Sequence, residues 1–266
     1  MRISRIIALL TVIALSLGAL TSCGGVEKKL GMAEDHFRSN PYQVKITVDF
    51  DTAAEDVAGI FSELEKTETT VIFDGASFTA TNVTSIKAGD SAYKFNTTYT
   101  VIGETAYREI SHESDGIPSI PLRSYTFLDA TQRQTLAYKV ARVGGVTTDG
   151  FANLTDTKID SKTVSIECTE ASDEVKESMR QMMVSFFEGT LERAVAKSVT
   201  LTLTLKDGHY RTATVVCDYD VTIGGTVYSV SARVNLELDF GYQYKVTAPA
   251  EPTRYSIIDP EEMLPL

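Results

Sequence analysis

Hydrophobic and polar residues alternate with a period of two along most of the chain, which is the pattern of half-buried β-strands. The alternation is clearest at residues 42–50. Similar runs cover residues 69–73, 77–87, 93–101, 106–111, 124–128, 135–143, 162–169, 199–205, 210–223, 227–238 and 241–246. Asp74-Gly75, Asp207-Gly208 and Gly224-Gly225 separate several of these runs. Such dipeptides favour tight hairpins, so we predict about ten antiparallel strands.

Two segments have the spacing of a helix instead. Thr52 stands three residues before Glu55, as in a capping box, and apolar residues follow at helical intervals, which predicts a helix over 53–66. Ser172 precedes Asp173 and Glu174, a capped acidic start that predicts a second helix over 173–197. The fold class predicted is mainly β (α+β): one large curved antiparallel sheet, a half-barrel, with both helices against its concave face.

The first 23 residues differ from the rest. Arg2 and Arg5 precede an apolar or small stretch over 6–20, the layout of a secretory signal. The stretch is shorter than the ~20 residues that cross a bilayer. It ends in Leu20-Thr21-Ser22-Cys23, which resembles the lipobox of bacterial lipoproteins. The resemblance implies that Cys23 is acylated and anchors the protein to the outer side of the cell membrane. A plain secreted protein is the alternative.

These features divide the chain into a signal peptide (1–22), a lipidated Cys23 with a flexible tether (23–40), one domain (41–258) and a C-terminal tail (259–266). The chain carries 36 acidic and 25 basic residues, a net charge of −11. That balance argues against nucleic acid as a partner, because binding requires Lys and Arg to neutralise phosphates. Cys168 and Cys217 fall at inward positions of strands, where a disulfide and two buried thiols are both compatible with the sequence.

The order of elements over residues 40–258 resembles the half-barrel of the LolA carrier and of LppX-type lipoproteins. The closest match is the C-terminal third, in which a helix and three long strands lead to Tyr244-Lys245-Val246-Thr247-Ala248-Pro249. The resemblance implies an apolar cavity between the sheet and the helices that accepts acyl chains or another hydrophobic ligand.

Three groups of residues are candidates for lining such a pocket. Methionines are flexible and suit irregular apolar ligands, and the late helix carries several on its apolar side. The candidates are Met179, Met182, Met183 and Phe186 on that helix, Tyr93, Phe95 and Tyr99 on one strand, and Ile117 and Ile120 in a proline-containing loop. For the first two groups the alternative is ordinary core packing. For the loop, a mobile lid and a segment packed on the rim are both open.

No catalytic motif is present: the sequence has no nucleophile elbow, no His-Glu-x-x-His, no Cys-x-x-Cys and no glycine-rich phosphate loop. We therefore predict no catalytic residues, no metal and no cofactor. Two function classes remain. One is a protein that binds or carries a lipid-like molecule at the envelope, and the other is a structural or protein-interaction lipoprotein with a filled core.

Overall fold

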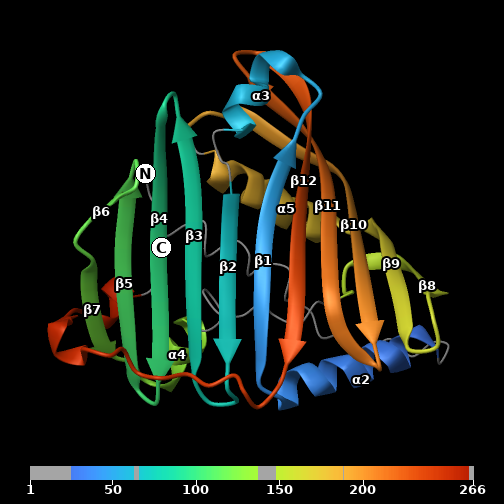
Figure 1. The fold of residues 1–266 in the computed structure, drawn as a ribbon. Helices are drawn as coiled ribbons and strands as arrows, with labels where there is room; N and C mark the ends of the chain where they lie inside the picture. Colours follow the sequence, from blue (N-terminus) through green and yellow to red (C-terminus); the bar gives the residue numbers. More distant parts are fainter. Residues whose placement is uncertain (1–24, 63–65, 137–147, 188, 264–266) are drawn as a thin grey trace.

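The computed structural model describes residues 25–62, 66–136, 148–187 and 189–263. In this part of the chain, thirteen strands form one open sheet (Figure 1). From one edge to the other, the order is β13 (Ser256–Ile257), β7 (Leu122–Phe127), β5 (Thr105–Ser114), β4 (Ser91–Ile102), β3 (Phe78–Ala88), β2 (Lys66–Phe73), β1 (Tyr42–Asp51), β12 (Thr226–Phe240), β11 (His209–Ile223), β10 (Arg193–Lys206), β9 (Thr163–Ala171) and β8 (Phe151–Lys158). The short β6 (Ile117–Pro118) pairs with β5.

The predicted single antiparallel sheet is confirmed. Neighbouring strands pair antiparallel throughout, except that β13 pairs parallel with β7. The alternation seen in the sequence is the alternation of burial: Val44, Ile46 and Val48 of β1 are buried, while Lys45 and Asp49, which point to the other face, are exposed. Successive side chains of a strand point to opposite faces, so the inward residues of all strands share one face, and most of them on β1 and β10–β12 are apolar.

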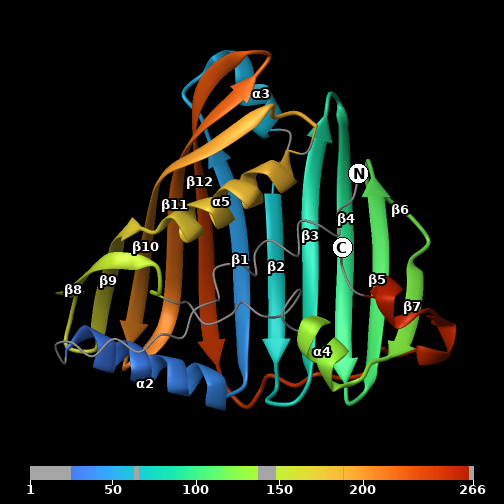
Figure 2. The same ribbon diagram turned by 180° about the vertical axis from the view of Figure 1, so that it is seen from behind.

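The helices lie mainly on the inner face of this sheet (Figure 2). The long α5 (Asp173–Phe186) crosses it and packs on β10. α2 (Val26–Ser39) packs on β11, and α3 (Glu55–Ser62) lies at the far end of β1. Near β3–β7 only two short helices are described, α4 (Ala130–Leu136) and α6 (Pro260–Met263). Within the described residues, the helices thus cover β9–β12 more thickly than β3–β7.

The sequence predicts a flexible tether here, with at most a marginal helix near residues 30–37, and the structure has a longer helix, Val26–Ser39. Leu30, Ala33 and Phe37 of α2 are buried against the sheet, and the Phe37 ring stacks on Tyr42 with centroids 4.5 Å apart. Residues 30, 33 and 37 lie on one face of a helix, so contact with the sheet stabilises a helix that would be marginal alone. Cys23 lies outside the described residues.

The late helix is shorter than the predicted 173–197. It ends at Phe186, where the Phe187 amide donates to the Met183 carbonyl oxygen (3.3 Å). Gly189 then takes φ +84°, a left-handed conformation that glycine adopts without strain and that commonly ends helices. β10 begins at Arg193, so five residues assigned to the helix, 193–197, belong to the sheet.

Several other segments differ from the prediction. Residues 117–122, predicted to be irregular, begin with β6, which forms a hairpin with β5 around Asp115-Gly116. Residues 151–157, predicted to be a loop, belong to β8, and residues 241–246 form no strand. Residues 135–136 of a predicted strand end α4, and 137–143 lie outside the described residues.

The C-terminal segment is also more tightly bound than a surface tail. It contributes the edge strand β13, and in α6 the side chain of Met263 is fully buried. The Asp74 carboxylate accepts a hydrogen bond from the Val246 amide (3.2 Å) and so ties the start of this segment to the β2–β3 turn. Residues 26–39 and 260–263 therefore pack on the domain predicted over 41–258.

Candidate ligand-binding site

The methionine side of α5 faces the sheet. Met179, Met182 and Met183 are almost completely buried. The Tyr219 hydroxyl of β11 donates a hydrogen bond of 2.8 Å to the carbonyl oxygen of Met179. Burial raises the pKa of Tyr219, so this donor stays protonated at neutral pH. These methionines belong to the core between helix and sheet, and a ligand-binding role for them stays a prediction.

Phe186 occupies the end of the same helix in an aromatic cluster. Its ring lies edge-on to Phe50 of β1, with centroids 5.2 Å apart, and Phe187 lies 4.9 Å from both Phe50 and Phe61. Such edge-to-face pairs contribute about 0.5–1.5 kcal/mol beyond the area they bury. Phe186 therefore fixes the end of α5 against β1 and α3.

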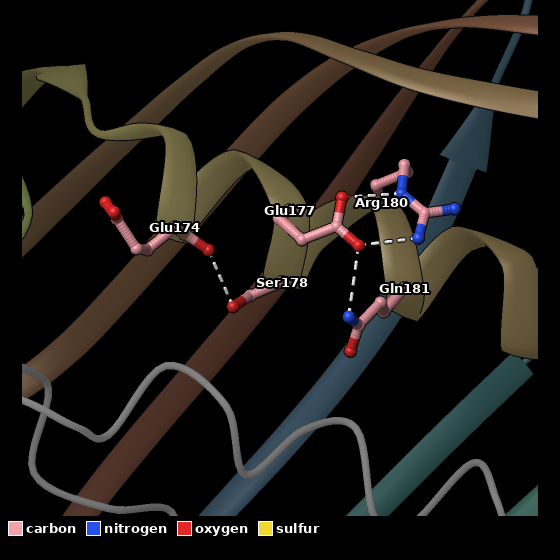
Figure 3. Close-up of polar contacts among 5 residues, drawn as sticks. All are labelled: Glu174, Glu177, Ser178, Arg180 and Gln181. Atoms are coloured by element: carbon pink, nitrogen blue, oxygen red, sulfur yellow. Dashed lines mark hydrogen bonds and ion pairs between the residues drawn. The ribbon is translucent and has the colours of Figure 1, made fainter.

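The opposite side of α5 is charged and exposed (Figure 3). The Glu177 carboxylate accepts hydrogen bonds from Arg180 Nε (2.7 Å) and Nη2 (2.5 Å), and from Gln181 Nε2 (3.1 Å). These donors lower the pKa of Glu177 to about 2. The charged side of the helix therefore points away from the sheet, consistent with the burial of its methionine side.

The three aromatic candidates of β4 share the inner face of the sheet. Tyr99 is buried, Phe95 is half-buried and Tyr93 is exposed, so the solvent exposure of the inward side chains increases toward the start of the strand. Directly opposite residues on antiparallel strands point to the same face. On β5, Arg108 lies opposite Tyr99, and His112 lies opposite Phe95 with their rings 6.4 Å apart.

The two isoleucines of the proline-containing segment are exposed. Ile117 is paired with Ser114 of β5, which is itself paired with Tyr93, so Ile117 extends the inner-face row that begins at Tyr93. Ile120 lies in the connection to β7. The Ser119 amide donates to the His112 carbonyl oxygen (2.7 Å), and the Ser119 hydroxyl accepts from the His112 amide (3.0 Å). The segment is thus held to the rim by hydrogen bonds.

A band of buried polar residues crosses the middle of the inner face. Its members are Thr67, Thr69, Asn82, Thr84 and Thr97. The side-chain Nδ2 of Asn82 donates to the Thr69 hydroxyl (2.9 Å), and the Thr84 hydroxyl donates to the side-chain Oδ1 of Asn82 (3.3 Å). Thr67 Oγ1 is buried and has no hydrogen-bond partner among the described residues. We call these five residues the polar band.

Arg108 adjoins the polar band on β5. Its Nη1 donates to the carbonyl oxygen of Glu262 in α6 (2.5 Å), and its guanidinium is hydrogen-bonded to Tyr99. Burial raises the pKa of Tyr99, an effect that Arg108 opposes. Arg108 Nε and the hydroxyl of its cross-strand neighbour Ser124 are buried without partners in the described part of the chain. Buried polar groups are normally satisfied, so this corner of the inner face has spare hydrogen-bonding capacity.

The outer face of the sheet carries a cavity of about 640 Å³ beneath the C-terminal segment. Four threonines line it, together with a Glu109–Arg123 ion pair (2.6 Å) and Tyr255, whose hydroxyl donates to Glu109 (3.3 Å). None of the side-chain atoms found buried without a partner in the described residues lies in this cavity. Two of its threonines, Thr79 and Thr100, also share a hydrogen bond between their hydroxyls (3.3 Å).

The cysteines and the potential metal ligands of the described residues were candidates for further chemistry. Cys168 and Cys217 are free thiols, and burial raises the pKa of each to about 12, so neither is a nucleophile at neutral pH. No group of three or more His, Cys, Asp or Glu side chains is placed to hold a metal within the described ranges. Among the helices that the structure describes, none has the length and apolarity to span a membrane.

Comparison with known proteins adds no assignment. No protein-family model matches the chain, and no curated protein is similar to it in sequence. A β-barrel-like protein of a domain of unknown function, DUF1849, from Brucella abortus is 12% identical over 77% of this chain and 99% of its own, with a TM-score of 0.29. The dehydratase domain of the CurH module of curacin polyketide synthase is 9% identical over 82% of this chain and 83% of its own, with a TM-score of 0.20. Scores this low support neither a family nor a function.

The structure therefore brings together part of the predicted set. Tyr93, Phe95, Tyr99 and Ile117 share the inner face of β4–β6, while the α5 residues lie in the core of the other half. The polar band and Arg108 were missed. Their signal in the sequence is a polar residue at an inward position of a strand, where alternation would place an apolar one.

Proposed function

We propose that this chain is a bacterial lipoprotein, anchored at the cell envelope through Cys23, that binds a lipid-like amphiphile on the inner face of β2–β7. The observation that carries the ligand is the exposure of apolar side chains there. Tyr93, Ile110 and Leu122 are 36%, 36% and 64% exposed, whereas the inward residues of β9–β12 are buried in the core. Exposed apolar patches on a protein surface usually mark sites of interaction.

The chemistry of this face fits an amphiphile better than a purely apolar molecule. Tyr93 lies at the start of β4, Ile110 of β5 lies opposite Thr97 of the polar band, and Arg108 lies one inward position further along, opposite Tyr99. A ligand with an apolar chain and a polar head satisfies both parts. The buried methionines of α5 favour a filled core in the other half, so the proposed site lies beside that helix rather than beneath it.

Native mass spectrometry of the purified full-length chain tests this proposal. Comparing native with denaturing spectra separates non-covalently bound lipid from acyl chains attached to Cys23. We expect a co-purified lipid on the unmodified chain and on Val227→Glu, which adds a carboxylate to an exposed outer position of β12. Ile110→Glu places the same charge on the inner face and should abolish binding, because a carboxylate in an apolar site is poorly solvated.

Absence of lipid on the unmodified chain would favour the alternative, a structural or protein-interaction lipoprotein. Equal loss from both glutamate variants would show that the inner face is not the site. The anchor is tested separately. Cys23→Ala should block incorporation of labelled palmitate and release the protein from the membrane fraction, and unchanged labelling would contradict the lipobox interpretation.

A further inference from the structure

The inner face of β2–β7 has an unusual charge composition. Its inward positions, read from the strand register, include Arg108 and His112 but no aspartate, glutamate or lysine. The outward positions of the same strands include Glu68, Glu109 and Glu113. In a chain with an excess of acidic residues, the inward positions of these strands carry no carboxylate and one permanent positive charge.

Not all hydrogen-bond donors of the Arg108 guanidinium have a partner among the described residues. A guanidinium offers five N–H groups in a planar fork that matches carboxylate and phosphate oxygens. The Glu262 carbonyl oxygen and Tyr99 engage Arg108 on one side. Nε is buried without a partner among the described residues, and so is the hydroxyl of Ser124, which is 4% exposed and lies directly across the strand pair. Two unsatisfied donors on neighbouring strands therefore lie side by side.

We propose that Arg108 and Ser124 bind the head group of the ligand and that this head group is an anion, a carboxylate or phosphate carried on an acyl chain. This inference rests on the proposed function. The chain of the ligand lies along β4 and β5 over Phe95 and Ile110 toward Tyr93. Tyr99 and Tyr93 are six residues apart on one strand, a length of ~20 Å. An acyl chain that fills half of a bilayer core of ~30 Å is no longer than that.

Isothermal titration calorimetry on the full-length chain tests the head group, with oleate, its neutral methyl ester and inorganic phosphate as probes. We expect oleate to bind at least tenfold more tightly than methyl oleate. We expect phosphate alone to bind weakly and not to displace oleate, because the apolar chain supplies part of the affinity. Displacement of oleate by phosphate would overturn the proposal in favour of a site for small anions.

Arg108→Gln should remove the preference for oleate and leave the affinity for methyl oleate unchanged. Arg123→Gln is the matched control, since Arg123 lies on β7 beside Ser124 but points to the outer face and pairs with Glu109. A preference lost in Arg123→Gln and kept in Arg108→Gln would move the ligand to the outer cavity and overturn the proposal.

Two further variants distinguish loss of binding from loss of the folded structure. Ser124→Ala removes a hydroxyl without a partner, so it should leave the unfolding midpoint unchanged or raised while weakening oleate severalfold. Arg108→Lys keeps the charge and loses the fork, so it should retain part of the preference. Equal affinity for oleate and its ester in the unmodified chain would refute the anionic head group and leave the proposed function standing. No binding of either probe would refute both.

Discussion

Two threonines of the polar band lie two residues apart on β2, and we predict that replacing them changes the free energy of unfolding in opposite directions. Thr67 is fully buried, and its hydroxyl has no hydrogen-bond partner in the described part of the chain. Thr69 is also buried, but its hydroxyl accepts the 2.9 Å hydrogen bond from Asn82. Valine has nearly the same shape as threonine, so Thr67→Val and Thr69→Val change polarity at matched positions.

The expected magnitudes follow from the hydrogen bonds. A buried polar group without a partner costs ~1–3 kcal/mol of folding free energy, so Thr67→Val should raise the free energy of unfolding by about 1 kcal/mol, at the lower end of that range. Thr69→Val leaves the Asn82 amide without its acceptor and should lower the free energy of unfolding by ~1–3 kcal/mol. The two variants should therefore differ by about 2 kcal/mol or more, which excludes a common effect of valine in this strand.

Urea unfolding followed by circular dichroism measures both changes. With an m-value of about 3 kcal/mol/M, a change of 1 kcal/mol moves the midpoint by about 0.3 M. The midpoint should rise for Thr67→Val and fall for Thr69→Val, with unchanged m. A fall of the Thr67→Val midpoint by as much as that of Thr69→Val would refute the reasoning, because it would mean that the Thr67 hydroxyl is already satisfied without a ligand.

Three further predictions concern the rest of the fold. Gly31→Ala, at a helical position of α2 with open space around it, should raise the free energy of unfolding by ~0.5–1 kcal/mol, and no change would argue that residues 26–39 are not helical in solution. Met182→Phe should overfill the core and destabilise by ~1–3 kcal/mol, whereas unaltered stability with displaced lipid would indicate a cavity beneath α5. Cys168 and Cys217 should resist a thiol reagent at pH 8 until urea is added, because burial raises their pKa to about 12; fast labelling of the folded protein would contradict that burial. Since the folded-state pKa is raised, both thiols should favour folding below pH 9 and progressively less as the pH rises toward 12.

The sheet could be predicted because one of its faces is buried along most strands. β1, β11 and β12 alternate between buried and accessible positions, and the sequence repeats that alternation in residue type. β8 was not predicted because it has no such buried face. It lies at the edge of the sheet with both faces largely exposed, so no burial pattern constrains its residues and nothing distinguishes it from a loop.

The helices show where local patterns are insufficient. The start of α5 was predictable because Ser172 caps it, its hydroxyl accepting from the Val175 amide (3.4 Å). Its end depends on Gly189 and on the pairing of β10 with its neighbouring strands. The residues from Arg193 onward form a strand because of that tertiary contact, which local sequence patterns do not show. The helix α2 is stabilised by its contact with β11, which the sequence does not show. Its outer side carries charged residues and Gly31, a composition that is also typical of a tether.

The candidate site was predictable only in its apolar part. Tyr93, Phe95 and Tyr99 follow from alternation along one strand, but their neighbours on β5 follow from the register, which the sequence does not specify. Whether Arg108 and Ser124 have partners is decided by what lies across the sheet and by α6. For Met179, Met182 and Met183, the sequence could not distinguish the lining of a flexible pocket from a packed core, since both favour apolar side chains.

The central claim is that an amphiphile lies on the inner face of β2–β7 with its head at Arg108. Photo-crosslinking of the full-length chain with a fatty acid that carries a diazirine near the end of its chain, followed by peptide mapping, tests it most directly. We predict adducts near Tyr93 at the start of β4 and near Ser114 at the end of β5, suppressed by excess oleate and absent from Ile110→Glu. Adducts on α5, or on the C-terminal segment that covers the outer cavity, would contradict the account.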